Sequence, residues 1–457
     1  MKNNKIRLVL EVELLIILLF GITFLIIPQN VQRNNIIVYF TLGLNGTCWL
    51  YLLVNEVQKH AFSMAMMHWC FCLLFFFFAV LVQYTNDAFP WVKYRDDEIL
   101  VTTNFILFLW TIGIWIGQHI KKTKKYPVSI KKIDCTKYAK ICVVLMSLIA
   151  FWRIKTVGFT DLLARSTAES KANYDSISML VDHTMQAGAY MVCIISIIAF
   201  KQIKKLWPYA LCCTVLMVIA YPPSGMARYA AAAIYFGILL TFSDKLREGR
   251  LFIFIFMGSF SIILPLLNAF RLLSFDNVDI ITTLSKVIHN FSNEWLAGDY
   301  DAYTMLTLAV QDIQENGILW GRQLIGVILF FVPRSLWKDK PVGTGHQIAT
   351  NLHWNFTNLS CPLPAEAIMN FGYIGVIVFA IVIGYIVKEV DNSYWNIEKR
   401  SKNKMEFYSL ELLYPVSTIF FFYMCRGDLM SSYSYVMAYI MVWAIISWWM
   451  NKKIVIK

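Results

Sequence analysis

Long apolar runs dominate this sequence and constrain its fold more than any other feature. Each run is close to the roughly 20 residues that a helix needs to cross a bilayer, whereas membrane-spanning strands would give short alternating segments. Only 15% of the residues are charged, against roughly 25% in soluble domains. The pattern predicts an all-α, polytopic membrane protein with about 12 transmembrane helices, near residues 8–27, 35–54, 64–85, 99–119, 138–155, 181–200, 206–223, 227–243, 251–270, 367–387, 405–424 and 432–450.

The distribution of positive charge predicts how these helices are oriented. If the N-terminus lies inside and the connections alternate, the inner segments hold 25 lysines and arginines and the short outer loops hold 7. Positive charge in short loops marks the cytoplasmic face, so we expect both termini to be cytoplasmic. The net charge of +12 then reflects orientation signals against anionic lipid, such as KKTKKYPVSIKK, and nucleic acid is not an expected partner.

One connection differs from all others in length. Residues 271–366 separate the ninth and tenth predicted spans, and by the alternation they are extracytoplasmic. Within them, the semi-apolar stretch 318–332 is too short and interrupted to cross, so we expect it to be interfacial or re-entrant. The chain as a whole, residues 1–457, reads as a single integral membrane domain whose large outer loop forms short helices over an outward cavity.

Arginines gather on the face that should be poor in positive charge. Arg228, Arg271 and Arg426 lie at predicted outer helix ends, and Arg334 lies in the long loop with Lys338 and Lys340 nearby. Charge near membrane depth is costly and often marks a site, and the guanidinium fork suits a phosphate or diphosphate. The alternative is that each arginine simply reaches the outer headgroups.

Two further residues of the outer loop are candidates for acid–base chemistry. His346 follows PVGTG, and histidine is the side chain that ordinarily changes charge near neutral pH, so it could accept a proton from a sugar hydroxyl. Glu366 could be a base, hold a hydroxyl, or complement a helix N-terminus. Asp299 and Asp301 in GDYDAY could chelate a divalent ion, but such spacing is common by chance, and we predict no metal site.

Three stretches together resemble a known family. FFVPRSLWKDKPVGTGHQIA (330–349), NLSCPLPAEAIMNFGYIG (358–375) and SGMARYA (224–230), with the predicted topology, resemble Wzy-type polymerases of O-antigen and capsule repeat units. The likeness is strongest over 320–385 and in the SGMARYA stretch, and elsewhere it is one of topology.

The resemblance implies a membrane-embedded glycosyltransferase architecture (GT-C-like) in the cytoplasmic (inner) membrane of a bacterium. The enzyme would be inverting and metal-independent, need no cofactor, and join oligosaccharide repeat units carried on undecaprenyl diphosphate at the outer face. Membrane lipids, a flippase and a chain-length regulator of the same pathway are the implied partners. Arg228, Arg271, Arg334 and His346 fit the family pattern; Lys338, Lys340, Glu366 and Arg426 are added from charge and location. An O-antigen ligase, or a lipid-linked oligosaccharide flippase or other transporter, is the alternative.

The predicted topology can be tested at His346. Reporter fusions after residues 300 and 346 should behave as extracytoplasmic, and fusions after residues 204 and 400 as cytoplasmic, because of the distribution of charge. A cytoplasmic His346 would overturn both the topology and the assignment of an outward site.

Overall fold

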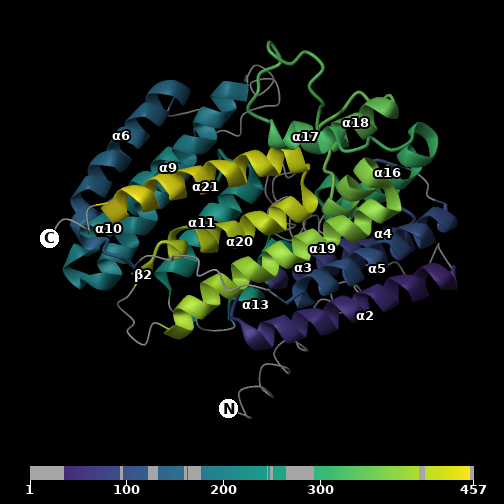
Figure 1. Cartoon of the computed structure of the whole chain (residues 1–457), viewed down its shortest axis with the longest axis horizontal. Coiled ribbons are helices and arrows are strands. Elements are labelled where there is room, and N and C mark those ends of the chain that lie inside the picture. Colours follow the sequence, from purple (N-terminus) through teal and green to yellow (C-terminus); the bar gives the residue numbers. More distant parts are fainter. Residues whose placement is uncertain are drawn as a thin grey trace, which may run out of the picture.

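The computed structural model describes residues 35–92, 96–121, 132–158, 162, 176–243, 245–246, 251–263, 293–400 and 407–452. These residues are almost entirely helical (Figure 1). Besides helices, turns and loops, they contain an antiparallel pairing of two-residue strands, β1 (Lys132–Ile133) with β2 (Phe407–Tyr408). The all-α expectation is confirmed for this part of the chain.

The helices follow the predicted spans closely in order and position. The first group is α2 (Ile36–Lys59), α3 (Met64–Phe71), the π-helix η1 (Cys72–Phe78), α4 (Ala79–Thr85), α5 (Asp97–His119), η2 (Thr136–Tyr138), α6 (Ala139–Val157), α9 (Ser176–Gln202), η3 (Lys204–Leu206), α10 (Trp207–Ala220) and α11 (Arg228–Phe242). The second is α13 (Leu251–Gly258), the π-helix η4 (Ser259–Ile263), η5 (Gly298–Tyr300), α16 (Ala302–Asn316), α17 (Arg322–Ile328), α18 (Thr344–Asn351), α19 (Leu363–Arg400), α20 (Leu410–Arg426) and α21 (Leu429–Lys452).

Several of these helices are suited to cross a membrane. Within the described residues, six segments are long and apolar enough to do so: Ile36–Lys59, Met64–Thr85, Asp97–His119, Ser178–Gln202, Leu363–Asn396 and Leu429–Met450. The chain is therefore a multi-pass helical membrane protein, while twelve crossings stay a prediction. The first predicted span, 8–27, lies outside the described residues.

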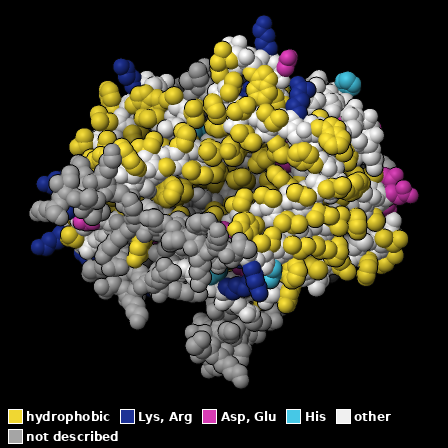
Figure 2. All heavy atoms as spheres, viewed as in Figure 1, with side chains coloured by type: hydrophobic (Ala, Val, Ile, Leu, Met, Phe, Trp, Pro, Cys, Tyr) yellow, Lys and Arg dark blue, Asp and Glu magenta, His cyan; other side chains and the backbone are white. Residues whose placement is uncertain are grey.

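The outer surface of the bundle is apolar over a broad face. Figure 2 shows hydrophobic side chains covering the middle of the view, with most charged groups toward its edges. Large apolar side chains such as Phe40, Phe151 and Ile374 are 69%, 69% and 77% exposed. Soluble monomers rarely expose contiguous apolar patches of this kind, and lipid is the solvent that suits them.

A central helix made of α3, η1 and α4 forms the core. Ser63 begins it by accepting a hydrogen bond from the amide of Met66. Every residue of η1, CLLFFFF, is buried, and one of its rings packs edge-to-face on α20, as between Phe75 and Phe422, with centroids 5.9 Å apart. A helix that is apolar all round is stable only when it is surrounded, and this one is.

The helix pair α5 and α19 packs with almost no side chain between the backbones. A Cβ on Gly117 would lie 2.2 Å from the carbonyl oxygen of Ile381, and one on Gly113 would lie 2.6 Å from the Cβ of Ala380. Small residues four apart allow this approach, and van der Waals contact then drives association within lipid. α19 also departs from the predicted span 367–387: it runs on to Arg400 and is broken at Gly372, which has φ +64°.

The segments that connect the helices lie at the two ends of the bundle, where they contact one another. At one end β1 pairs with β2, and the indole of Trp395 donates to the carbonyl of Phe62. At the other, the amide of Gln83 donates to the carbonyls of Trp295 and Tyr300. The segments predicted to share a side thus lie at the same end, called here the inner and the outer end. Which compartment each faces stays a prediction.

The described part of the long loop, from residue 293, forms short helices at the outer end. α16, α17 and α18 lie beside the turn between α20 and α21 (Figure 1). Within the stretch 318–332, α17 spans seven residues, or about 10 Å, too short to cross a bilayer. The amides of Leu319 and Gly321 donate to the carbonyls of Met369 and Asn370, which ties this stretch to the break in α19.

The α5–α19 contact yields a stability prediction. Gly117→Ala should lower the free energy of unfolding by about 1–3 kcal/mol, because the added methyl meets backbone that cannot move independently. The matched control is Gly43→Ala in α2, where a Cβ meets no atom within 4 Å and helix propensity favours alanine by about 1 kcal/mol. Thermal unfolding in detergent measures both. Equal midpoints for the two variants would refute the close packing.

Candidate functional site

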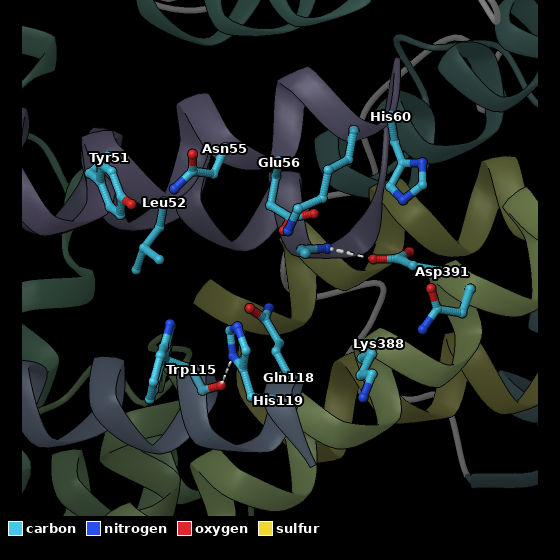
Figure 3. Close-up of a pocket in the computed structure, with 13 residues that line it drawn as sticks. Tyr51, Leu52, Asn55, Glu56, His60, Trp115, Gln118, His119, Lys388 and Asp391 are labelled. Atoms are coloured by element: carbon cyan, nitrogen blue, oxygen red, sulfur yellow. Dashed lines mark hydrogen bonds and ion pairs between the residues drawn. The ribbon is translucent and has the colours of Figure 1, made fainter. Parts of the chain in front are cut away.

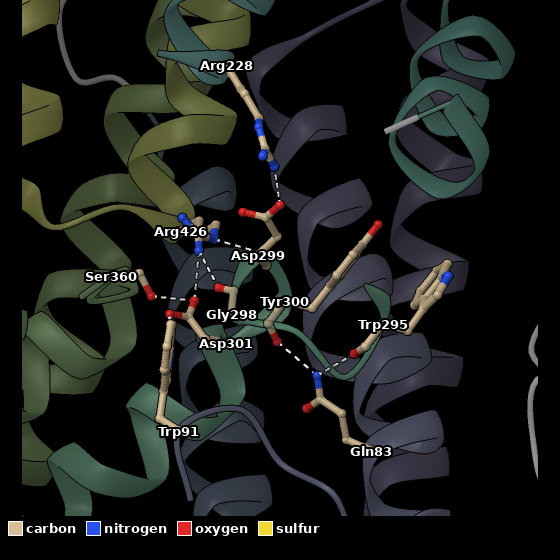
Figure 4. A network of polar contacts seen from close by, with 10 residues as sticks. All are labelled: Gln83, Trp91, Arg228, Trp295, Gly298, Asp299, Tyr300, Asp301, Ser360 and Arg426. Carbon is tan, nitrogen blue, oxygen red and sulfur yellow. Dashed lines mark hydrogen bonds and ion pairs between the residues drawn. The ribbon is translucent and has the colours of Figure 1, made fainter. Parts of the chain in front are cut away.

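Two arginines hold the segment Gly298–Asp301 at the outer end (Figure 4). Arg426, the last residue of α20, donates from Nε to the carbonyl of Asp299 at 2.9 Å and from Nη2 to that of Gly298 at 2.7 Å. Its Nη2 also lies 3.0 Å from a carboxylate oxygen of Asp301, which is 1% exposed. Arg426 therefore serves as the buried anchor of this segment.

Asp301 is satisfied on all sides. Besides Arg426, its carboxylate accepts a hydrogen bond from the indole of Trp91 at 2.9 Å and one from the hydroxyl of Ser360 at 2.6 Å. A buried charge is tolerated only when it is paired and hydrogen-bonded in this way. The carboxylate thereby joins four separate segments of the chain at one point.

Arg228 occupies a more open position than Arg426. It is the first residue of α11 and pairs with the carboxylate of Asp299. The two side chains are 29% and 43% exposed, so water screens the pair and its net energy is small. A ligand phosphate can replace the Asp299 carboxylate on the same guanidinium fork, at little cost to the fold.

Partly exposed tyrosines extend from the arginines into the bundle. The rings of Tyr229 and Tyr423 stack with centroids 4.9 Å apart, and the guanidinium of Arg426 lies 5.4 Å from the centroid of Tyr229. Tyr435 follows 6.4 Å from Tyr423, and its ring stacks on His183 at 3.7 Å. An aromatic wall beside cations offers an apolar face for a sugar ring and donors for its hydroxyls.

A second cluster holds two buried carboxylates between α18, α19 and α21. Glu366 accepts hydrogen bonds from the hydroxyl of Thr344 and from the amide of Leu429, the latter at 2.9 Å. Asp428 accepts the amide of Gly345 at 3.1 Å. Both acids thus cap neighbouring helix starts, which satisfies orphan amides and complements the helix dipole.

The environment of Asp428 raises the pKa of its carboxyl above the usual range. Burial raises the pKa of Asp428, while the amide of Gly345 and, more weakly, the nearby His346 lower it. His346 follows Gly345 on α18 and remains partly exposed. A partly exposed imidazole with a buried carboxylate close by is an arrangement that can take up a proton and stabilise the resulting charge.

Cys361 links the two clusters. Burial raises the pKa of its thiol, and the negative charges of Glu366, Asp428 and Asp301 raise it further, in that order. The thiol therefore lies within electrostatic reach of all three acids. The arginine-bound segment and the carboxylate pair are neighbours, joined through residues 360–366.

Two further cations in the described part of the long loop, Arg334 and Lys340, make their hydrogen bonds within the loop. Arg334 is exposed, and its guanidinium donates to the carbonyls of Lys340 and Pro341. The ammonium of Lys340 donates to the carbonyls of Phe330 and Val332, and burial, followed by the charge of Arg334, lowers its pKa. Lys338 is exposed to solvent. Arg334 and Lys340 hold the shape of residues 330–341, which is a role that the sequence did not suggest.

The structure brings together only part of the predicted set. Arg228 and Arg426 meet through the 298–301 segment, and Glu366 lies near His346 through Asp428; Arg271 lies outside the described residues. Asp428 was missed, although its place in CRGDLM between two apolar runs was a signal. Asp299 and Asp301 form ion pairs with Arg228 and Arg426. Among the described residues, no group of three or more His, Cys, Asp or Glu is arranged to hold a metal ion.

Fold and site together define a multi-pass helical membrane protein with a cationic, aromatic and acidic cluster at one end. Comparison of the chain with protein-family models, with curated proteins and with solved structures finds no match.

The different burial of the two arginines predicts different effects on stability. Arg426→Ala should lower the free energy of unfolding by about 3–5 kcal/mol, because it leaves the Asp301 charge buried without a cation. Arg228→Ala should cost about 1 kcal/mol or less, because its pair is screened by water. Unfolding of both variants in the same detergent compares them directly. A larger loss for Arg228→Ala would show that the anchor has been misassigned.

Proposed function

We propose that this protein is an inverting glycosyltransferase that polymerises oligosaccharide repeat units carried on undecaprenyl diphosphate. The observation that carries the proposal is the half-open pair of Arg228 with Asp299, set beside the wall formed by Tyr229, Tyr423 and Tyr435. A guanidinium that can exchange its carboxylate for a phosphate, next to aromatic faces, suits a sugar diphosphate. The family resemblance of residues 320–385 points to the same substrate class.

In the proposed reaction the acceptor hydroxyl attacks the anomeric carbon of the donor from the face opposite the diphosphate. The new glycosidic C–O bond forms as the bond between the anomeric carbon and the phosphate oxygen breaks, and the lipid diphosphate leaves with the electron pair. Arg228 stabilises the charge that grows on the leaving group, while Arg426 keeps the 298–301 segment in place. The configuration at the anomeric carbon inverts.

The proton of the acceptor hydroxyl needs a base, and His346 is the assigned residue. It is partly exposed, and the charge of Asp428 would stabilise the imidazolium that forms. Glu366 is the reserve base, although Thr344 and Leu429 already donate to its two carboxylate oxygens. Asp428 then acts as a positioning residue, through His346 rather than on the substrate.

The first functional test concerns Arg228. Arg228→Ala should reduce polymer formation about tenfold to a hundredfold, because one charge-assisted phosphate contact is worth about 1.5–3 kcal/mol. Arg228→Lys should retain only part of the wild-type rate of polymer formation, since lysine lacks the bidentate fork. The measurement is polymerisation of purified lipid-linked repeat units. Arg322→Ala, which removes an exposed arginine of the same loop that donates to the carbonyl of Asp339, is the matched control and should leave the rate within about twofold. Wild-type activity of Arg228→Ala would refute the phosphate role.

The second test concerns the base and separates polymerase from its alternatives. A strain carrying His346→Ala should insert the protein normally yet display single repeat units on the final carrier, because chains cannot be extended. Polymer stranded on undecaprenyl diphosphate would indicate a ligase, and the absence of any repeat unit would indicate a flippase. Wild-type polymer from this strain would move the base to Glu366 or remove the need for one.

A further inference from the structure

A pocket of about 460 Å³ lies at the inner end, opposite the arginine cluster (Figure 3). It opens between α2 and α5, beyond the hydrogen bonds that join the two helices nearer their middle. The helices are bonded from Asn45 to the carbonyl of Asn104 and from the indole of Trp49 to Thr111. Beyond that point Tyr51 and Trp115 line the pocket, and they are 67% and 47% exposed. The volume is within the range of ligand sites.

The flanking aromatic residues place the pocket at headgroup level. Tyrosine and tryptophan are enriched at the membrane–water boundary, and both helices carry exposed apolar residues on the side toward lipid. Lys59 and His119 are the last residues of α2 and α5, as expected where helices leave the hydrocarbon. The occupant therefore enters sideways from the inner leaflet.

The lining carries both signs of charge in equal number. Glu56 and Lys59 form an ion pair, and Lys388 donates to the carbonyl of Ile120 at the end of α5. Asp391 caps α3 through the amides of Met64 and Ala65. With two lysines and two carboxylates in one pocket, a singly anionic ligand would leave an uncompensated charge, whereas a zwitterion would not.

One donor in this pocket has no hydrogen-bond partner among the residues that the structure describes. The side-chain nitrogen of Gln118 is buried and makes no hydrogen bond among the described residues. Figure 3 shows Gln118 directed from α5 toward α2, below Glu56, into the pocket. An orphaned buried donor costs about 1–3 kcal/mol unless a ligand or water accepts from it. A phosphate oxygen is an acceptor that fits this position.

We propose that the pocket binds the headgroup of a zwitterionic aminophospholipid of the inner leaflet. The phosphate accepts from Gln118 and lies near Lys388, while the primary ammonium donates to Glu56 and to Oδ2 of Asp391, which within the protein accepts from the amide of Ala65. The acyl chains run outward past Tyr51 and Trp115. This site does not depend on the proposed function, because it lies at the other end of the bundle.

The test measures thermal unfolding of the full-length protein in detergent on titration with short-chain phosphatidylethanolamine, phosphatidylcholine or phosphatidylglycerol. We expect saturable stabilisation by phosphatidylethanolamine and an apparent affinity at least about tenfold weaker for the other two, because each lacks the donating ammonium. Equal responses to all three lipids, a preference for phosphatidylglycerol, or no response would each overturn the proposal.

Gln118→Leu distinguishes a ligand site from a structural defect. If the orphaned amide serves no ligand, leucine should raise the unfolding midpoint without lipid and leave the lipid response unchanged, which would count against the proposal. We expect instead that the affinity for phosphatidylethanolamine falls about tenfold, whatever the midpoint without lipid.

Lys388→Met should likewise weaken phosphatidylethanolamine binding. Its matched control is Lys204→Met, which removes an exposed lysine at the same end that packs over Phe200, away from the pocket. An equal effect of the two lysine variants would show that lipid binding depends only on the general surface charge of this end, and it would overturn the assignment.

Discussion

The buried pair of Arg426 with Asp301 is the interaction on which the outer end of this bundle depends. Asp301 directly precedes α16, Arg426 ends α20, and Trp91 and Ser360 bring two further segments to the same carboxylate. In a low-dielectric environment each group would be costly alone, so all four segments must arrive together. The position of Arg228, Asp299 and Tyr229 follows from that assembly.

This dependence separates cations that build the fold from those that can meet a ligand. Arg426, Arg334 and Lys340 direct their donors at backbone carbonyls within the protein. Arg228 faces a half-exposed carboxylate that a phosphate can replace. In the sequence all of these residues are equivalent positive charges. Only the groups that each one contacts in the fold distinguish a structural cation from one that can bind a ligand. The proposed phosphate contact is therefore assigned to the cation whose partner is most easily exchanged.

The sequence predicts most of the helices because a bilayer demands long apolar runs, and that demand is local. It also predicts which connections share an end, as the hydrogen bond from Trp395 to Phe62 illustrates. It does not predict the break at Gly372 or the seven-residue π-helix η1, because both are set by neighbours far along the chain. Asp428 escaped notice for the same reason. Its importance comes from Gly345 and Glu366, which lie more than sixty residues away and come near only in the fold.

Helix α19 runs between the two ends of the bundle. It carries Glu366 at the outer end and Asp391 at the inner end, and between them its backbone lies directly on α5 through Gly113 and Gly117. Close-packed backbones transmit displacement because no side chain lies between them to absorb it. The break at Phe371 and Gly372 lies just outward of that contact, where the amides of Leu319 and Gly321 bond to α19. The inner pocket is thus part of the rigid α5–α19 pair, while the carboxylate cluster lies beyond the break. A headgroup bound at the inner end would stabilise the pair without moving the outer acids, so we expect its occupancy to change the stability of the protein rather than the chemistry at the arginine cluster.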